Sequence, residues 1–347
     1  MNLLRRLVRP WANVGLRRGS NDDDYVARMA AETLVYKDVA DINLLPGIFH
    51  YWSNKYLRSM IEEFGFSNPD QFFAKYLLQS AESTGEAQPR FVSIGAGNCD
   101  TEVRVAKLLR DAGCRGFTIE CLDMNPHMLQ RGREFAKQED VGDFVAFTEG
   151  DFNRWRPAGT YAGVMANQSL HHVMNLEGLF DAIASAMHPK ALFITHDMIG
   201  RNGHMRWPEA LAEVQRFWQE LPREYRYNRS LQRQEDKYIN WDCSSEGFEG
   251  IRAQDIVPLL LKRFHFRVFI GFANVIDVFV DRAFGHNFDE NGEWDRDFID
   301  RVHAFDESAI RAGTITPTHM MAVMGLDEGA PCVSARGVTP EMSVHIG

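Results

Sequence analysis

The chain has 347 residues, of which 45% are hydrophobic and 25% charged, so it can bury a sizeable core as one large domain or two small ones. Its formal net charge of -10 argues against general nucleic-acid binding, in which a basic face supplies most of the affinity. Five scattered cysteines include no Cys-x-x-Cys pair, so we expect reduced thiols in a cytoplasmic protein without a disulfide framework or zinc site. No apolar run approaches the length of a membrane span.

The first 20 residues are basic and have an apolar side, with Arg5, Arg6, Arg9, Arg17 and Arg18 and no acid. The segment is too polar for a secretory signal peptide. One interpretation is an amphipathic segment that makes a peripheral contact with an anionic membrane surface. The other, which we favour, is an N-terminus that frays or packs on the body of the protein.

Residues 1–89 are expected to form an N-terminal helical segment. Asp22, Asp23 and Asp24 are typical of the start of a helix, and a further helix is predicted from Ser67, with Asn68 and Pro69 in its opening turn. Residues 42–66 contain an aromatic cluster that either closes over a ligand or packs in the core. Residues 82–89 read as a linker.

Residues 90–123 organise the rest of the chain. A short apolar strand at 91–94 leads into the turn Gly95-Ala96-Gly97, an amphipathic helical pattern follows, and a second strand at 117–122 ends at Asp123. This order of strand, glycine-rich turn, helix, strand and acid predicts a βαβ unit that holds a nucleotide-like ligand. Glycines without a Cβ allow a sharp turn against a ligand, and an acid at the strand end can accept both hydroxyls of a ribose.

The position of a third glycine in dinucleotide-binding turns is occupied by Asp100. A carboxylate there would repel a pyrophosphate but would attract a sulfonium and an α-amino group. This substitution favours S-adenosylmethionine over NAD as the ligand.

At this point the chain resembles the class I S-adenosylmethionine-dependent methyltransferases. The resemblance rests on residues 93–100 as the first motif, 122–125 as the ribose-binding acidic motif, 149–152 as the third motif and 168–172 after the fourth strand. It implies that Asp151 meets the adenine amino group and that Phe152 packs on the ring. The cofactor-binding residues so predicted are Gly95, Ala96, Gly97, Asp100, Asp123, Met124, Asn125, Asp151, Phe152, Asn167 and Gln168.

The core is expected to span residues 90–198. Helices are predicted at 126–137 and 176–187, and strands at 144–148, 161–166 and 191–195. Strict alternation of strands and helices predicts a doubly wound α/β fold with a mostly parallel sheet, and the resemblance implies seven strands. Ligands on such sheets bind beyond the carboxyl ends of the strands, where Asp123, Asp151, residues 167–172 and residues 196–197 all fall.

Residues 199–250 break the alternation and are rich in aromatic residues and arginine, so we expect a helical cap that shapes the substrate pocket. The predicted substrate-contacting residues are His171, Arg201, His204, Arg206 and Trp207.

Residues 251–325 are expected to complete the core. A helix is predicted at 251–263, strands at 264–272, 274–280 and 319–324, and an insertion at 284–305. The resemblance makes 319–324 the antiparallel seventh strand, and it implies that the N-terminal segment acts as a lid. Residues 326–347 are expected to form a loose tail.

Methyl transfer from a sulfonium needs an acceptor held in line and, for a hydroxyl acceptor, a base. His172 or His196 is the predicted base, with Asp197 orienting or assisting it. His171 and His172 also fit a packing or cofactor role, which the resemblance implies for histidines at this place. Asn167 stands where the metal-dependent catechol type has an aspartate, so no metal is expected.

The predicted acceptor is the hydroxyl of a small molecule or glycan. Two alternatives stay open, namely a non-catalytic S-adenosylmethionine-binding protein and an NAD(P)-dependent oxidoreductase. Asp100 and the antiparallel final strand count against the oxidoreductase. The acceptor itself and the oligomeric state do not follow from the sequence.

Overall fold

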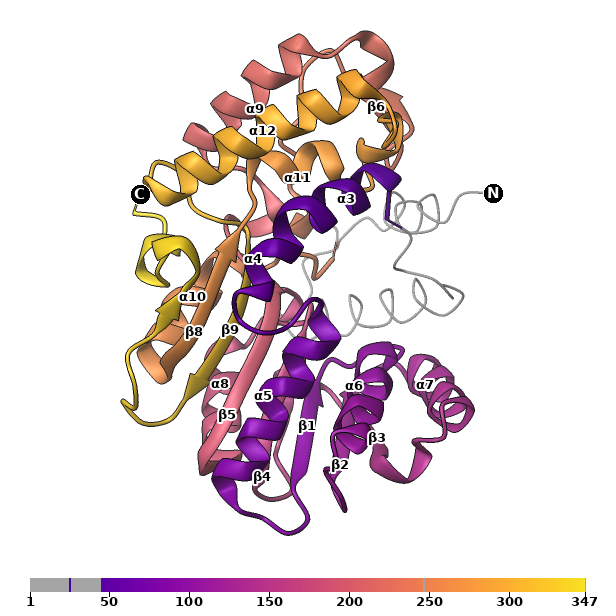
Figure 1. Cartoon of the computed structure of the whole chain (residues 1–347), viewed down its shortest axis with the longest axis vertical. Helices are drawn as coiled ribbons and strands as arrows, with labels where there is room; N and C mark the ends of the chain where they lie inside the picture. The colour runs from indigo at the N-terminus through magenta and orange to yellow at the C-terminus, as the bar shows by residue number, and fades with distance from the viewer. Residues whose placement is uncertain (1–24, 26–44, 246, 347) are drawn as a thin grey trace.

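The computed structural model describes residue 25, residues 45–245 and residues 247–346 (Figure 1). The basic segment at 1–20 and the predicted helix start at 22–24 lie outside these residues. Within the described part, no helix combines the length and apolar character needed to cross a membrane.

A single eight-stranded sheet forms the centre of the lower half of Figure 1, in the order β10-β8-β9-β5-β4-β1-β2-β3. β9 is antiparallel to both of its neighbours, while the other neighbouring pairs are parallel. The mostly parallel sheet and the antiparallel strand predicted at 319–324 are therefore confirmed. The strands are β1 (Arg90–Ile94), β2 (Thr118–Asp123), β3 (Val145–Glu149), β4 (Tyr161–Asn167), β5 (Met187–Met198), β8 (His265–Phe272), β9 (His319–Gly325) and β10 (Val333–Ser334).

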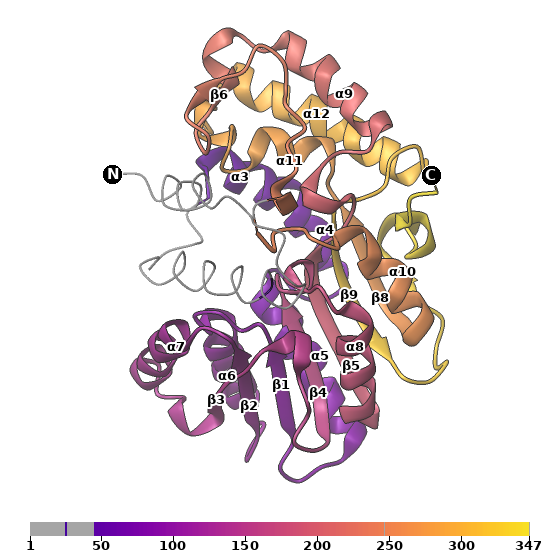
Figure 2. The same cartoon turned by 180° about the vertical axis from the view of Figure 1, so that it is seen from behind.

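Helices cover both faces of this sheet, as expected for a doubly wound fold. One face carries α4 (Arg58–Glu62), α5 (Pro69–Thr84), α6 (Asp100–Asp111) and α7 (Pro126–Gln138). The other carries α8 (Leu176–Ala186) and α10 (Ala253–Arg263), which lie nearer the viewer in Figure 2. Fully buried side chains such as Phe72 of α5 and Leu260 of α10 anchor the two layers.

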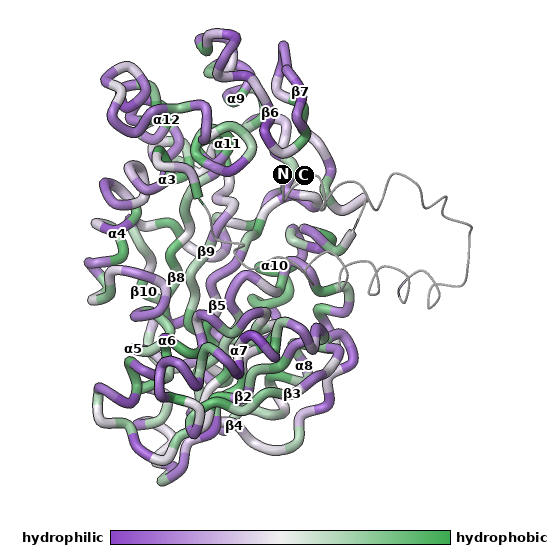
Figure 3. Tube along the Cα trace, turned by 90° about the vertical axis from the view of Figure 1, so that its right-hand side faces the viewer, coloured by the Kyte–Doolittle hydropathy of each residue, from purple (hydrophilic) through white to green (hydrophobic). Residues whose placement is uncertain are grey.

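Local signals explain where these helices begin and end. The side chain of Asn68 accepts a hydrogen bond from the Gln71 N–H at 2.9 Å and caps α5, with Pro69 in its first turn. Asn125 caps α7 in the same way ahead of Pro126. Figure 3 colours α7 and α12 mainly as hydrophilic with recurring hydrophobic positions, as expected for helices with one face in water.

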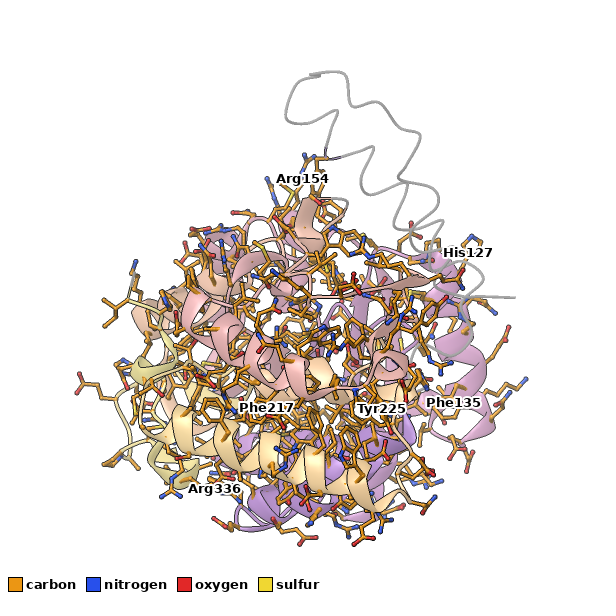
Figure 4. All side chains as sticks on the ribbon, turned by 90° about the horizontal axis from the view of Figure 1, so that it is seen from above. His127, Phe135, Arg154, Phe217, Tyr225 and Arg336 are labelled. Atoms are coloured by element: carbon orange, nitrogen blue, oxygen red, sulfur yellow. The ribbon has the colours of Figure 1, made fainter. Side chains whose placement is uncertain are left out.

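A second helical layer lies above the sheet and forms the cap (Figures 1 and 2). It contains α3 (Gly47–Trp52), α9 (Pro208–Glu220), α11 (Val275–Val280) and α12 (Glu293–Arg311), with a small hairpin of β6 (Tyr227–Asn228) and β7 (Arg233–Gln234). Phe217 of α9, labelled in Figure 4, contacts the rings of Phe298 and Phe305 at centroid distances of 6.1 and 5.7 Å. The cap therefore combines the predicted segment 199–250 with one helix from earlier in the chain and two from later.

The prediction of a strand at 274–280 is wrong, because Val275–Val280 forms helix α11. Its β-branched residues favour a strand locally, but five of its six side chains are buried in the cap. The Asp306 carboxylate accepts hydrogen bonds from the N–H groups of Asn274 and Val275 at 3.0 and 2.7 Å. This contact from α12 fixes the start of the helix, and it cannot be read from the local sequence.

The sheet has eight strands instead of the expected seven, because the C-terminal tail contributes one. β10 pairs with Val268 and Phe269 of β8, and the neighbouring Ala335 and Val338 are 2% exposed. The segment 326–347, expected to be loose, is thus folded onto the sheet edge in its described part. Its short apolar stretches gave too weak a periodicity to predict this packing.

The aromatic cluster of residues 42–66, in its described part, packs against α12. The hydroxyls of Tyr51 and Tyr56 donate to Asp300 at 2.9 and 2.7 Å, and the Trp52 indole N–H donates to Nδ1 of His303 at 3.1 Å. These contacts fix the N-terminal segment to the cap.

Candidate active site

The glycine turn after β1 is bound tightly to the end of β2. The N–H groups of Gly95 and Ala96 both donate to the Leu122 carbonyl, at 2.9 and 3.1 Å. Gly95 has φ +69°, and a Cβ on it would lie 2.6 Å from the Cβ of Ser169. Only glycine fits this turn without a shift of the loop that carries Ser169.

Asp123 closes β2 and faces the turn. One carboxylate oxygen accepts the Gly97 N–H and the other accepts the Asn125 N–H, both at 2.8 Å. Burial raises the pKa of Asp123, and the two backbone N–H groups partly offset this effect. Each carboxylate oxygen has a second lone pair, so both can still accept a hydrogen bond from a diol.

A cavity of about 230 Å³ opens between these elements at the carboxyl ends of the strands. Ten of the eleven residues predicted to bind the cofactor line it, namely Gly95, Ala96, Gly97, Asp100, Asp123, Met124, Asn125, Phe152, Asn167 and Gln168. Asp151 is engaged beside it, since its Oδ1 accepts the Tyr25 hydroxyl at 2.8 Å and the Asn153 N–H at 2.9 Å.

Six further residues line the cavity, namely Asn98, Thr101, Glu102, Met128, Ser169 and His172. Of these, the sequence analysis assigned only His172 a role at the site. Thr101 and Met128 lie in the first turns of the helices that follow the glycine turn and Asp123. A position in the first turn of a helix, next to a predicted ligand residue, is a sequence signal from which both residues could have been predicted to line the site.

The cavity suits the chemistry of S-adenosylmethionine. Asp123 offers acceptors to a ribose, and Asp100 at the start of α6 offers a carboxylate to a sulfonium or an ammonium. Met124, Met128 and Phe152 supply apolar surface for a purine ring. Gly95 and Gly97 have no side chain, so the ligand can approach the backbone of the turn closely.

Asp197, near the end of β5, is the hub of the loop that follows β4. Its fully buried carboxylate accepts the N–H groups of Ser169, Leu170 and Met198 at 2.9, 2.7 and 2.8 Å. Oδ1 also lies 2.6 Å from Nδ1 of His171. Burial opposes its charge, but His171 and these N–H groups lower the pKa of Asp197. Asp197 therefore positions the loop and the His171 ring.

Three histidines gather around Glu249. The Nε2 atoms of His171 and His204 lie 3.4 and 2.8 Å from Oε1, and Nε2 of His172 lies 3.6 Å from Oε2. The His171 and His172 rings are 4.2 Å apart between centroids. No spacing motif connects Glu249 to the histidines, so its place in this site could not be predicted from the sequence.

The charges in this cluster are strongly coupled. Burial lowers the pKa of His171, but the carboxylates of Asp197 and Glu249 outweigh it and raise that pKa to about 10. Burial and the neighbouring His171 lower the pKa of His172 to about 4. Burial opposes the charge of Glu249 as well, yet His172 and the other two histidines hold its pKa well below the usual range.

His196, the other predicted base, lies on β5 beneath the loop. Its ring nitrogens lie 3.2 Å from Oδ1 of Asn167 and 3.3 Å from Nε2 of Gln168. Burial and the nearby His319 lower the pKa of His196 to about 4. The ring therefore holds two side chains that line the cavity.

The predicted substrate residues of the cap contact other residues of the protein. Arg206 is buried, and its Nε donates to the Asn274 carbonyl at 3.0 Å. Trp207 stacks on His345 at 3.9 Å, and the Arg201 guanidinium lies 5.3 Å from the Trp207 ring centre. His171 and His204 join the Glu249 cluster, and substrate contact by all five residues remains a prediction.

This fold and this cavity define a class I S-adenosylmethionine-dependent methyltransferase. The sequence family described as a methyltransferase domain matches residues 70–252, which is more than half of the chain, and the chain belongs to this family. The chain thus contains a methyltransferase domain.

Individual relatives are distant. A sterol 24-C-methyltransferase of Eremothecium gossypii is 26% identical over 125 residues, which are 36% of this chain and 31% of that enzyme. The alignment thus spans about a third of the relative's length. An O-methyltransferase from a trans-AT PKS multienzyme of Brevibacillus brevis, in complex with S-adenosyl-L-homocysteine, is 12% identical with a TM-score of 0.45, covering 84% of this chain and 86% of that one. A geranyl diphosphate C-methyltransferase of Streptomyces coelicolor A3(2) is 10% identical with a TM-score of 0.45, covering 86% and 98%.

Proposed function

We propose that the enzyme methylates a hydroxyl group of a small molecule or glycan, with His172 receiving the hydroxyl proton. The observation that carries this proposal is the place of His172. It is the histidine that lines the same cavity as the glycine turn and Asp123. A base at that place lies beside both the methyl donor and an incoming acceptor.

S-adenosylmethionine supplies a methyl carbon on a positively charged sulfur. The new oxygen–carbon bond forms as the carbon–sulfur bond breaks, and the bonding electron pair leaves with the sulfur. His172 accepts the proton released from the acceptor hydroxyl. Its Nε2 lies 3.6 Å from the Glu249 carboxylate, which would stabilise the resulting imidazolium.

The remaining residues act by positioning. His196 holds Asn167 and Gln168 at the cavity wall, and Asp197 holds the loop from Ser169 to His172. An acceptor held by fixed walls reacts faster because the entropy lost in orienting it is lost on binding, before the chemical step.

The test uses purified enzyme, S-adenosylmethionine and a panel of phenols, alcohols and saccharides, with release of S-adenosylhomocysteine and product mass as readouts. His172→Ala should lower turnover by about 10²- to 10⁴-fold while affinity for S-adenosylhomocysteine is unchanged. His188→Ala is the matched control, because His188 lies at the start of β5, whereas the cavity lies at the carboxyl ends of the strands.

Methylation at carbon or nitrogen would contradict the proposal. So would turnover that is equal in the two variants. An equal loss of turnover and cofactor affinity in His172→Ala would make His172 a cofactor or packing residue.

A further inference from the structure

We propose that His171, His204 and Glu249 form a binding site for a divalent transition-metal ion beside the cofactor cavity. Each residue offers one ligand atom, and the three atoms all lie within 4.8 Å of one another. The residues come from three separate segments that the fold brings to one point. No metal is expected from the sequence, because the cysteines are scattered and Asn167 stands where the metal-dependent catechol type has an aspartate.

The distances suit a metal with two nitrogen ligands and one oxygen ligand. Ligands bound at about 2.0–2.2 Å in tetrahedral or octahedral geometry lie about 3.0–3.5 Å from each other. The Glu249 Oε1 atom lies 3.4 Å from Nε2 of His171 and 2.8 Å from Nε2 of His204. A small outward movement of the His204 ring would open the remaining space.

Asp197 prepares His171 for this role. Its Oδ1 lies 2.6 Å from Nδ1, so the proton of a neutral imidazole is held on Nδ1 and the lone pair of Nε2 points at Glu249. A carboxylate behind a histidine is the usual support of a metal-binding imidazole, because it fixes the tautomer and the ring orientation.

The charge balance also favours a cation. In the part of the chain that the structure describes, the ion pairs of Asp197 and Glu249 are all made with histidine, with no lysine or arginine among them. The two carboxylates carry two negative charges, which would balance a divalent ion once that ion displaces the proton from His171. The two imidazole ligands favour ions such as Zn²⁺, Co²⁺ or Fe²⁺ over Mg²⁺.

The location connects the metal to the acceptor side of the cavity. His172 follows His171 directly and lines the cavity, while its Nε2 lies 3.6 Å from Glu249. An ion held by three protein ligands keeps positions open for an oxygen ligand. If the proposed O-methylation holds, this ligand is the acceptor oxygen, and the substrate class narrows to oxygen compounds that can bind a metal.

The experiment titrates tag-free full-length protein with Co²⁺, followed by visible absorption, and with Zn²⁺ and Mg²⁺, followed by calorimetry. We expect one Co²⁺ per chain with the spectrum of a site of low coordination number, displacement by Zn²⁺, and no comparable binding of Mg²⁺. Glu249→Gln and His204→Ala should each weaken Co²⁺ binding at least 100-fold. The control His188→Ala, at the start of β5, should leave it unchanged.

Binding of S-adenosylhomocysteine to each variant shows that it is folded. Absence of saturable Co²⁺ binding in wild type, or binding unaffected by Glu249→Gln and His204→Ala, would overturn the proposal and leave an ion-paired cluster. A preference for Mg²⁺ would overturn the assigned class of metal. The titration contains no acceptor, so its result is independent of the proposed methylation.

Discussion

The cofactor turn and the histidine cluster are held together in different ways. In the turn, backbone N–H groups of residues 95–97 and 125 bind partners fewer than 35 positions away, and the contacts close within one βαβ unit. In the cluster, the side chains of His171, His172 and His204 meet around the carboxylate of Glu249. The first arrangement is set by local sequence, and the second depends on the whole fold.

This difference predicts different responses to mutation. Changes in the turn should weaken cofactor binding, because the turn lines the cofactor cavity directly. Changes in the cluster should affect both folding and catalysis, because its members are buried and share partners.

The largest effect is expected for Asp197→Ala. Removing this fully buried carboxylate leaves three backbone N–H groups and the His171 ring without their acceptor, so the free energy of unfolding should fall by about 4 kcal/mol. Urea unfolding measures this change. Asp181→Ala removes an aspartate whose side chain is 72% exposed, and it should change stability little. Similar losses in the two variants would show that Asp197 is not the hub.

Gly95→Ala tests the close fit of the turn. Its Cβ would meet Ser169 at 2.6 Å in a left-handed backbone conformation, so the variant should lose about 3 kcal/mol of stability. Gly85→Ala has a similar φ of +67° with nothing within 4 Å of the added Cβ, and it should lose about 1 kcal/mol. Thermal unfolding of both variants isolates the steric part. Equal losses would mean that the loop of Ser169 moves aside freely.

Asp123→Ala should weaken S-adenosylhomocysteine binding by about 2 kcal/mol, because a charged acceptor for the ribose is lost. Calorimetric titration gives the change in affinity. The exposed Asp143→Ala is the matched control and should bind as wild type does. Unchanged affinity in Asp123→Ala would place the ribose elsewhere.

The smallest effect concerns Glu102, which lies under the glycine turn. Burial raises the pKa of Glu102 to about 7, so the folded protein binds this proton more tightly than the unfolded chain does. Stability should therefore fall as pH rises from about 4.5 through about 7, with about 1 kcal/mol lost between pH 6 and 8. Glu102→Gln should remove this slope in unfolding curves, whereas the exposed Glu134→Gln should keep it. An unchanged slope in Glu102→Gln would assign the effect to another group.

Much of the cofactor half could be predicted because its signals are local. The glycine turn, Asp123 and the Asn-Pro starts of α5 and α7 each lie within a few residues of the structure that they specify. The alternation of strands and helices from 90 to 198 follows from hydrophobic periodicity. Asp151 is not among the residues that line the cavity, and its carboxylate accepts a hydrogen bond from Tyr25, which lies 126 positions away.

The cap and the cluster could be predicted less well because tertiary contacts decide them. Helix α11 has the composition of a strand but is capped by Asp306 of α12. Glu249 carries no motif, and its role is set by histidines up to 78 positions earlier in the chain. The edge strand β10 is too short for any periodicity to show.

The most direct test of the account is a calorimetric titration of the purified protein with S-adenosylmethionine, S-adenosylhomocysteine and NADH in parallel. We predict one-to-one binding of both adenosyl ligands and none of NADH, with the adenosyl binding weakened in Asp123→Ala. Binding of NADH with no binding of the adenosyl ligands would contradict the assignment of Asp100 and of the cavity as a methyl-donor site.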